Sequence, residues 1–65
     1  MTAIELRECL DALHWSHREL ARTLEINLST VQDWAAGKWP VPPRIAAWLR
    51  ASAAALRAQP LPKDW

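Results

Sequence analysis

The chain of 65 residues has few of the groups that cross-link small proteins. Cys9 is the only cysteine, which excludes a disulfide within the chain and is typical of a reduced, cytosolic protein. His14 and His17 are three residues apart, but the second pair of ligands that a zinc site needs is missing. We therefore expect no metal and no other cofactor. Five tryptophans are the remaining means of reinforcing a small core.

Long apolar runs and a strong net charge are also missing. No segment approaches the roughly 20 apolar residues that cross a bilayer, and the acidic Glu5, Glu8 and Asp11 are unlike a basic signal peptide. We expect no membrane contact. The net charge of +1 does not by itself indicate nucleic acid, but the acidic residues concentrate in the first third. The basic residues that follow can form one basic face: Arg18, Arg22, Lys38, Arg44, Arg50 and Arg57.

A single glycine, little β-branching and abundant Ala, Leu and Arg favour helix throughout, so we predict an all-α fold. Thr2 with Glu5 and Ser16 with Glu19 have the spacing of capping boxes, Asn27 is a suitable N-cap, and Gly37 a suitable helix stop. Pro42 or Pro43 fits the first turn of a last helix. The prediction is a compact four-helix domain over residues 1–58, with helices at about 3–13, 17–24, 28–36 and 43–58. A Pro-containing tail, 59–65, follows, in which Leu61 and Trp65 are apolar enough to fold back.

Two apolar faces follow from helical spacing in the first and last helices. The predicted face of the first comprises Ile4, Leu6, Cys9, Leu10 and Leu13. That of the last comprises Ile45, Trp48, Leu49, Ser52 and Leu56. Arg50 and Arg57 lie beside this second face, and we expect them to be solvated.

The segment from His17 to Trp34 is the most informative part of the sequence. Apolar side chains fall where two crossing helices would bury them, Ile26 fills the connection, and Ala21 is small where the second helix crosses closely. Only Glu25, Ile26 and Asn27 separate the two predicted helices. This pattern is typical of a helix-turn-helix, whose second helix can enter the major groove of DNA.

Polar residues remain on the outside of that second helix. Gln32 can pair with adenine edges, and Ser29 or Thr30 with a base or a phosphate. Leu28, expected to be exposed, can touch a thymine methyl group. Asp33 either accepts a hydrogen bond from cytosine or is a solvated charge that repels phosphate, and we favour the second alternative. On the preceding helix, Arg18 and Arg22 serve either phosphate contact or solubility.

From about Leu13 to Leu49 the chain resembles the lambda-repressor-like, Xre/Cro-type helix-turn-helix proteins. The resemblance is carried by Trp15–Ala21, Ile26–Trp34 and the Ala35-Ala36-Gly37-Lys38 sequence. It implies base-facing positions at Asn27, Leu28, Ser29, Gln32 and Asp33. It also implies phosphate contacts from His17, Lys38 and Arg44. The sequence departs from the family in three ways: Glu25 stands where the turn usually has Gly, there is room for four helices instead of five, and the net charge is low.

The resemblance implies a cytoplasmic, bacterial or phage-encoded transcriptional regulator, a small repressor or autoregulator that binds double-stranded DNA. We expect a homodimer on a palindromic operator, formed through the Ala-rich end of the last helix, Ala51–Leu56, and the tail. We expect no small-molecule ligand and no enzymatic activity, because no nucleophile and base are paired in a plausible pocket. The alternative is a protein-interaction module, antitoxin-like or RNA-polymerase-binding, that uses the region of Trp39 and Trp65.

Overall fold

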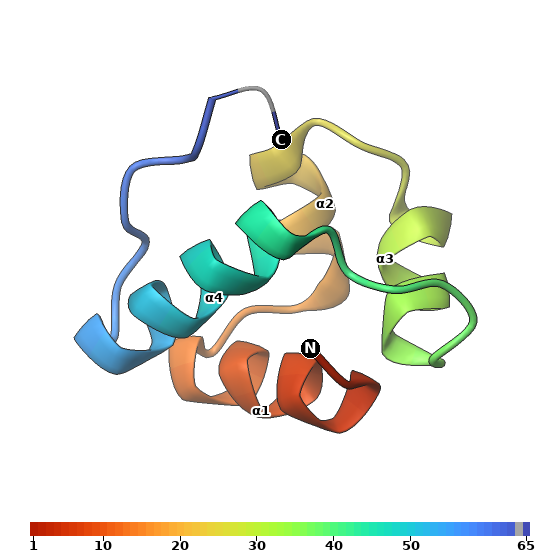
Figure 1. Cartoon of the computed structure of the whole chain (residues 1–65), viewed down its shortest axis with the longest axis horizontal. Coiled ribbons are helices and arrows are strands. Elements are labelled where there is room, and N and C mark those ends of the chain that lie inside the picture. Colours follow the sequence, from red (N-terminus) through yellow and green to blue (C-terminus); the bar gives the residue numbers. More distant parts are fainter. Residues whose placement is uncertain (64) are drawn as a thin grey trace.

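The predicted all-α fold is confirmed by a computed structural model, which describes residues 1–63 and 65. This described part contains four α-helices and no strand: α1 (Ala3–Leu13), α2 (His17–Leu24), α3 (Leu28–Ala35) and α4 (Pro43–Ala55) (Figure 1). Its radius of gyration of 10.4 Å is close to the roughly 11 Å expected for a folded chain of this length. In the described part, no helix has both the length and the apolar character needed to cross a membrane.

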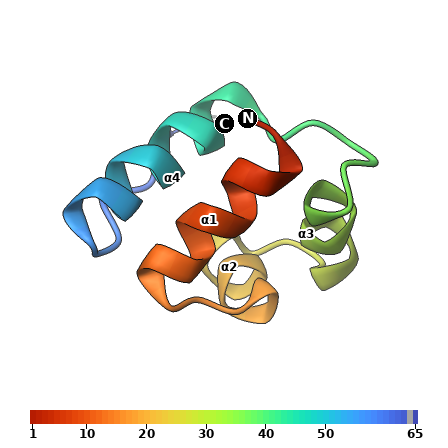
Figure 2. The same ribbon diagram turned by 90° about the horizontal axis from the view of Figure 1, so that it is seen from below.

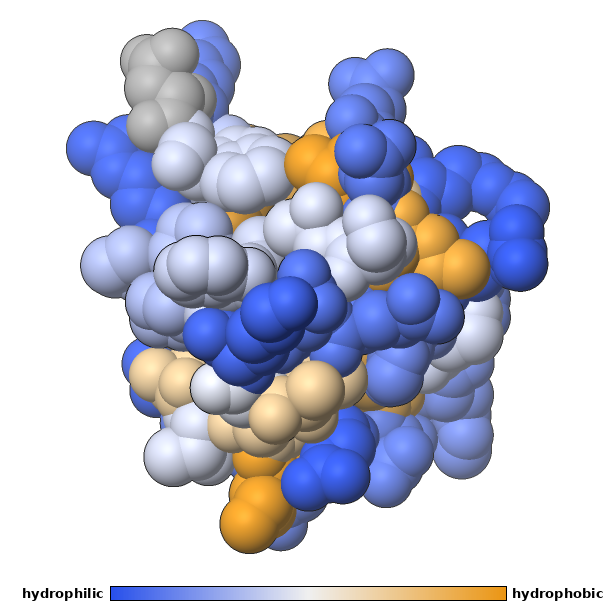
Figure 3. Space-filling view, turned by 90° about the vertical axis from the view of Figure 1, so that its right-hand side faces the viewer, coloured by the Kyte–Doolittle hydropathy of each residue, from blue (hydrophilic) through white to orange (hydrophobic). Residues whose placement is uncertain are grey.

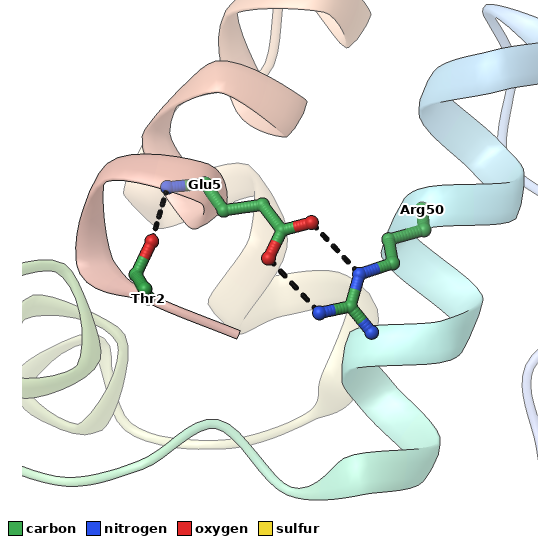
Figure 4. Close-up of polar contacts among 3 residues, drawn as sticks. All are labelled: Thr2, Glu5 and Arg50. Carbon is green, nitrogen blue, oxygen red and sulfur yellow. Dashed lines mark hydrogen bonds and ion pairs between the residues drawn. The ribbon is translucent and has the colours of Figure 1, made fainter.

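The starts of the first two helices use their capping residues differently. At α2 the box is complete: the Ser16 hydroxyl accepts from the Glu19 backbone N–H at 3.1 Å, and the Glu19 carboxylate accepts from the Ser16 N–H at 3.0 Å. At α1 only half of the predicted box forms. The Thr2 hydroxyl accepts from the Glu5 N–H at 3.0 Å, but the Glu5 carboxylate turns instead to Arg50 on α4 (Figure 4). A charged guanidinium is the stronger partner for a carboxylate.

The Arg50–Glu5 pair is bidentate and joins α1 to α4. Arg50 Nε donates to one Glu5 oxygen at 2.8 Å and Nη2 to the other at 2.9 Å. Arg50 is exposed, as expected, but its bond to Glu5 was not predicted. The hydrogen bond from Arg50 lowers the pKa of the Glu5 carboxyl below its usual value. Because the Arg50 and Glu5 side chains keep 50% and 38% of their surface exposed to solvent, the pair orients the two helices more than it stabilises the fold.

The ends of the helices share one geometry. A residue with positive φ follows each helix, and the two successive N–H groups there donate to carbonyls of its last turn, as in a Schellman motif. Gly37 plays this part after α3, as predicted, with φ of 77°. After the other helices the position is held by His14, Glu25 and Leu56, with φ between 57° and 58°. Residues with a Cβ adopt this region at a cost of about 1–2 kcal/mol.

The core lies between α1, α3 and α4, with α2 packed against α3 (Figure 2). Its fully buried apolar side chains come from every helix: Leu6, Leu20, Val31, Ile45 and Leu49. Two expected core residues are exposed instead, Ile4 at 64% and Leu56 at 71%. Ile4 lies in the first turn of α1 and points to solvent, whereas Ala3 and Glu5 on either side of it are half-buried, and Leu56 lies beyond the end of α4.

The predicted end of the last helix at residue 58 is also wrong, because α4 stops at Ala55 and the chain reverses at Leu56. The following residues 59–63, here called the strap, run back along α4. Gln59 makes two of the contacts: its carbonyl accepts from Trp48 Nε1 at 2.6 Å, and its N–H donates to the fully buried Ser52 hydroxyl at 3.0 Å. Trp48 also packs on Trp15, with ring centroids 5.7 Å apart. The tail therefore folds back onto the domain as predicted, but through backbone atoms of Gln59 and Lys63, whereas the apolar Leu61 and Trp65 are exposed.

Candidate nucleic-acid interface

The α2–α3 unit is held together by a short turn in which two successive backbone N–H groups bond back to α2. Glu25 has φ 57° and ψ 44°, and its N–H donates to the Arg22 carbonyl at 3.2 Å. The next N–H, from Ile26, donates to the Ala21 carbonyl at 3.0 Å. Ile26 packs against the core, and Ala21 is only 4% exposed. Glu25 thus adopts the left-handed conformation for which glycine is usually chosen.

The outer face of α3 is polar and open to solvent. Val31, Trp34 and Ala35 point into the core, which leaves Ser29 and Gln32 exposed and Asp33 half-buried on the other side of the helix. Asn27, just before the helix, is also exposed, and its side chain forms no capping hydrogen bond. Figure 3 looks onto the side of the molecule that carries α3 and shows a largely hydrophilic surface with smaller apolar patches. Four of the residues predicted to face bases therefore have polar groups available to a ligand: Asn27, Ser29, Gln32 and Asp33.

Two residues at the start of α3 are less accessible than the sequence suggested. Leu28 was expected to be exposed, but it is half-buried and packs against the core. Thr30 is half-buried as well. The turn before α3 brings Ile26 and Leu28 to the same apolar cluster, so Leu28 gains burial that its place on the helix did not indicate. Only part of its surface remains for a ligand.

The predicted phosphate-contacting residues fall into two groups. Arg18 and Arg22 are exposed one turn apart on α2, His17 is half-buried at its first position, and Lys38 is exposed just after α3. Arg44 differs, because its Nη1 donates to the Lys63 carbonyl of the strap at 2.8 Å. A guanidinium has five N–H groups, so this contact leaves others available.

The charge of this region is mixed. Asp33 is the one charged residue within α3, and Glu25 lies exposed in the turn. Glu19 on α2 remains an acceptor in its capping box. These carboxylates oppose the field of Arg18 and Arg22, so the surface attracts an anion less than its arginines alone would.

The loop between α3 and α4 has an anchor that sequence reasoning missed. Val41 is buried although prolines flank it on both sides. The signal was present, since Val41 is the one β-branched apolar residue in the loop. Trp39 in the same loop is 58% exposed, and Trp65 at the chain end is also exposed. Both therefore remain available to a partner.

Among the described residues, no group of three or more His, Cys, Asp or Glu side chains is placed to hold a metal ion, and no pocket is found. His14 is exposed beyond the end of α1, whereas Cys9 is buried inside the core. Burial raises the pKa of the Cys9 thiol above its usual value. Comparisons of the chain with protein families, with curated proteins and with solved structures find no match.

Proposed function

We propose that this protein is a sequence-specific DNA-binding regulator whose helix α3 enters the major groove. The observation that carries the proposal is the α2–turn–α3 unit. Its apolar side chains are buried in the core, while Ser29, Gln32 and Asn27 are presented together on the outside. Polar side chains on an exposed, rigidly mounted helix are what base-edge recognition requires. The sequence resemblance to Xre/Cro-type proteins supports the same role.

In this proposal the side chains divide by what they contact. Gln32 pairs with an adenine edge, and Asn27 and Ser29 bind neighbouring bases or phosphates. Arg18, Arg22 and Lys38 neutralise phosphates and set the position of α3 along the duplex. Asp33 keeps its charge partly exposed to solvent and repels phosphate, which weakens binding to any duplex. The activity is binding and not catalysis.

A single module of this size contacts about 600–1,000 Å² of DNA, which gives weak binding by itself. We therefore propose a two-fold dimer on a palindromic site, with half-sites about one helical turn apart. The protein acts as a small repressor or autoregulator of nearby genes. Its regulation then depends on its concentration and on its assembly.

The test is a fluorescence-anisotropy titration with DNA from upstream of the protein's own gene, at two salt concentrations. Binding should weaken steeply as salt rises, because neutralised phosphates release counterions. Gln32→Ala should cost ~1–3 kcal/mol on the cognate site and little on unrelated DNA, whereas Arg18→Ala should weaken both equally. Arg7→Ala, which removes the same charge from an exposed position of α1 outside the proposed contacts, is the matched control and should change neither. An unchanged operator affinity in Gln32→Ala would contradict the placement of α3.

The second candidate is a protein-interaction module, favoured by the exposed indole of Trp39 and by the carboxylates of Asp33 and Glu25 near the proposed groove face. Aromatic side chains are enriched at protein interfaces and carboxylates oppose phosphate. The same titration separates the two functions. No binding at low salt to any duplex would favour the interaction module. In the DNA-binding case, Trp39→Ala leaves affinity for DNA unchanged.

A further inference from the structure

The strap is bound to α4 mainly through its backbone. Trp48 Nε1 donates to the Gln59 carbonyl, the Ser52 hydroxyl accepts from the Gln59 N–H, and Arg44 donates to the Lys63 carbonyl. Each α4 group therefore recognises a main-chain atom of an extended segment that contains two prolines. The docking surface, made of Arg44, Trp48 and Ser52, is complementary to this segment whichever copy of the chain supplies it.

The reversal that brings the strap back is conformationally unfavourable. Leu56 has φ 58° and ψ 29°, and its side chain is 71% exposed, so no burial rewards this conformation. The local sequence, Ala53 to Ala58, consists of strong helix formers, and the first helix-breaking residue is Pro60. The segment thus favours continuing α4. The bend is held by the strap contacts together with two backbone hydrogen bonds, from the Leu56 N–H to the Ala53 carbonyl and from the Arg57 N–H to the Ser52 carbonyl.

If α4 continued through residues 56–58, the strap would project beyond the helix and could not reach its own Trp48. When a strained hinge precedes a segment that docks on a complementary surface, two copies of a protein can exchange that segment. We propose that the strap is exchanged in a dimer, so that residues 59–63 of each copy dock on Arg44, Trp48 and Ser52 of the other. Each strap contact is kept, and the strain at Leu56 is released.

The exchanged dimer is compatible with an exposed α3. In both ribbon views the start of the strap and the end of α4 lie on the opposite side of the molecule from α3 (Figures 1 and 2). The exposed small side chains near the end of α4, Ala51, Ala54 and Ala55, permit the two extended helices to approach closely. This inference deepens the proposed function, on which its biological use rests, since it supplies the dimer that a palindromic site requires.

The experiment is carried out without DNA, so its outcome is independent of the proposed function. The protein is refolded from urea at high concentration, and its mass is measured by light scattering after size exclusion over a dilution series. Equal parts of isotope-labelled and unlabelled protein, refolded together, are then examined by isotope-filtered NMR. We expect a dimer with intermolecular contacts between the Trp48 indole of one copy and the Gln59–Pro60 protons of the other.

Leu56→Gly is the decisive variant, because glycine adopts the bend without strain. In the wild type, release of the strain at one hinge favours the exchanged dimer over the monomer by about fivefold to thirtyfold, and a dimer contains two hinges. The dimer dissociation constant should therefore rise about thirtyfold or more. Ala47→Gly, at an exposed position of α4 that is helical in both forms and lies outside the proposed contact, is the matched control and should leave the constant within about threefold. The exchange is refuted by a wild-type protein that stays monomeric throughout, by Trp48–Gln59 contacts that are only intramolecular, or by a dimer indifferent to Leu56→Gly.

Discussion

The backbone of Glu25 offers a direct test of how the α2–α3 turn is formed. Its φ of 57° places a side chain in the left-handed region, and its carboxylate accepts no hydrogen bond from the described residues. Replacing Glu25 by Gly removes a conformational cost of about 1–2 kcal/mol. Glycine in turn makes the unfolded chain more flexible, which costs about 0.5–1 kcal/mol. Taking the middle of each range, the free energy of unfolding should increase by about 0.5–1 kcal/mol.

For a domain of this size, such a gain corresponds to a Tm increase of about 2–8 °C. The measurement is urea unfolding followed by tryptophan fluorescence and by circular dichroism, with thermal scans as a second route. The midpoint should rise while the slope with denaturant stays constant, because the folded surface does not change.

Glu25→Ala is the matched control, because it removes the same carboxylate but keeps a Cβ at the left-handed position. It should leave stability within about 0.5 kcal/mol of the wild type. Since the difference between the two variants isolates the backbone term, an Ala variant as stable as the Gly variant would show that charge, and not conformation, limits the turn. A Gly variant less stable than wild type would refute the reasoning.

Three further predictions concern the core and its surroundings. Ala21→Leu should destabilise the fold by about 1–3 kcal/mol in urea unfolding, because the buried α2–α3 contact has no room for it, whereas Ala47→Leu at an exposed site should change little. Cys9 is buried and the pKa of its thiol is raised, so it should react with iodoacetamide only as fast as the protein unfolds, and this rate should increase with urea. Rapid labelling of the native protein would contradict its burial. Because Arg50 lowers the pKa of Glu5, the pair's stabilisation is present above the unfolded-state pKa and is lost as the pH falls through the folded-state pKa. Arg50→Ala should therefore bring the Glu5 titration, followed by carboxyl NMR, back toward its usual value and weaken the acid dependence of the unfolding midpoint; an unchanged titration would argue against the bond in solution.

Local signals were enough to predict most of the helix frame. Ser16 caps α2 through neighbours within one turn, and Gly37 stops α3 through its own backbone freedom, so both could be predicted from adjacent residues. The end of α4 could not be predicted in this way. The sequence from Ala55 to Ala58 favours helix, and the contacts that oppose a longer helix are made by the strap after the chain reverses. The partner of Glu5 could not be predicted locally either, because its carboxylate bonds to Arg50, 45 residues away, and not to the backbone at the start of α1.

The candidate site divides in the same way. The outward position of Ser29 and Gln32 follows from helical periodicity and the buried Val31, so it could be predicted. The partial burial of Leu28 depends on how the turn presents it to the core, and the engagement of Arg44 depends on the path of the strap. Both are tertiary effects, which no local pattern encodes.

The packing of α1 against α4 determines when the protein can fold during synthesis. The partners of α1 begin to include α4 only after Pro43, and the Glu5–Arg50 and Trp15–Trp48 contacts join α4 to α1 and to the segment that follows α1. On the ribosome, the α2–α3 unit is therefore complete before the core that supports it exists. A chain that lacks α4 leaves the apolar face of α1 without the helix that covers it, and it should be open to proteolysis.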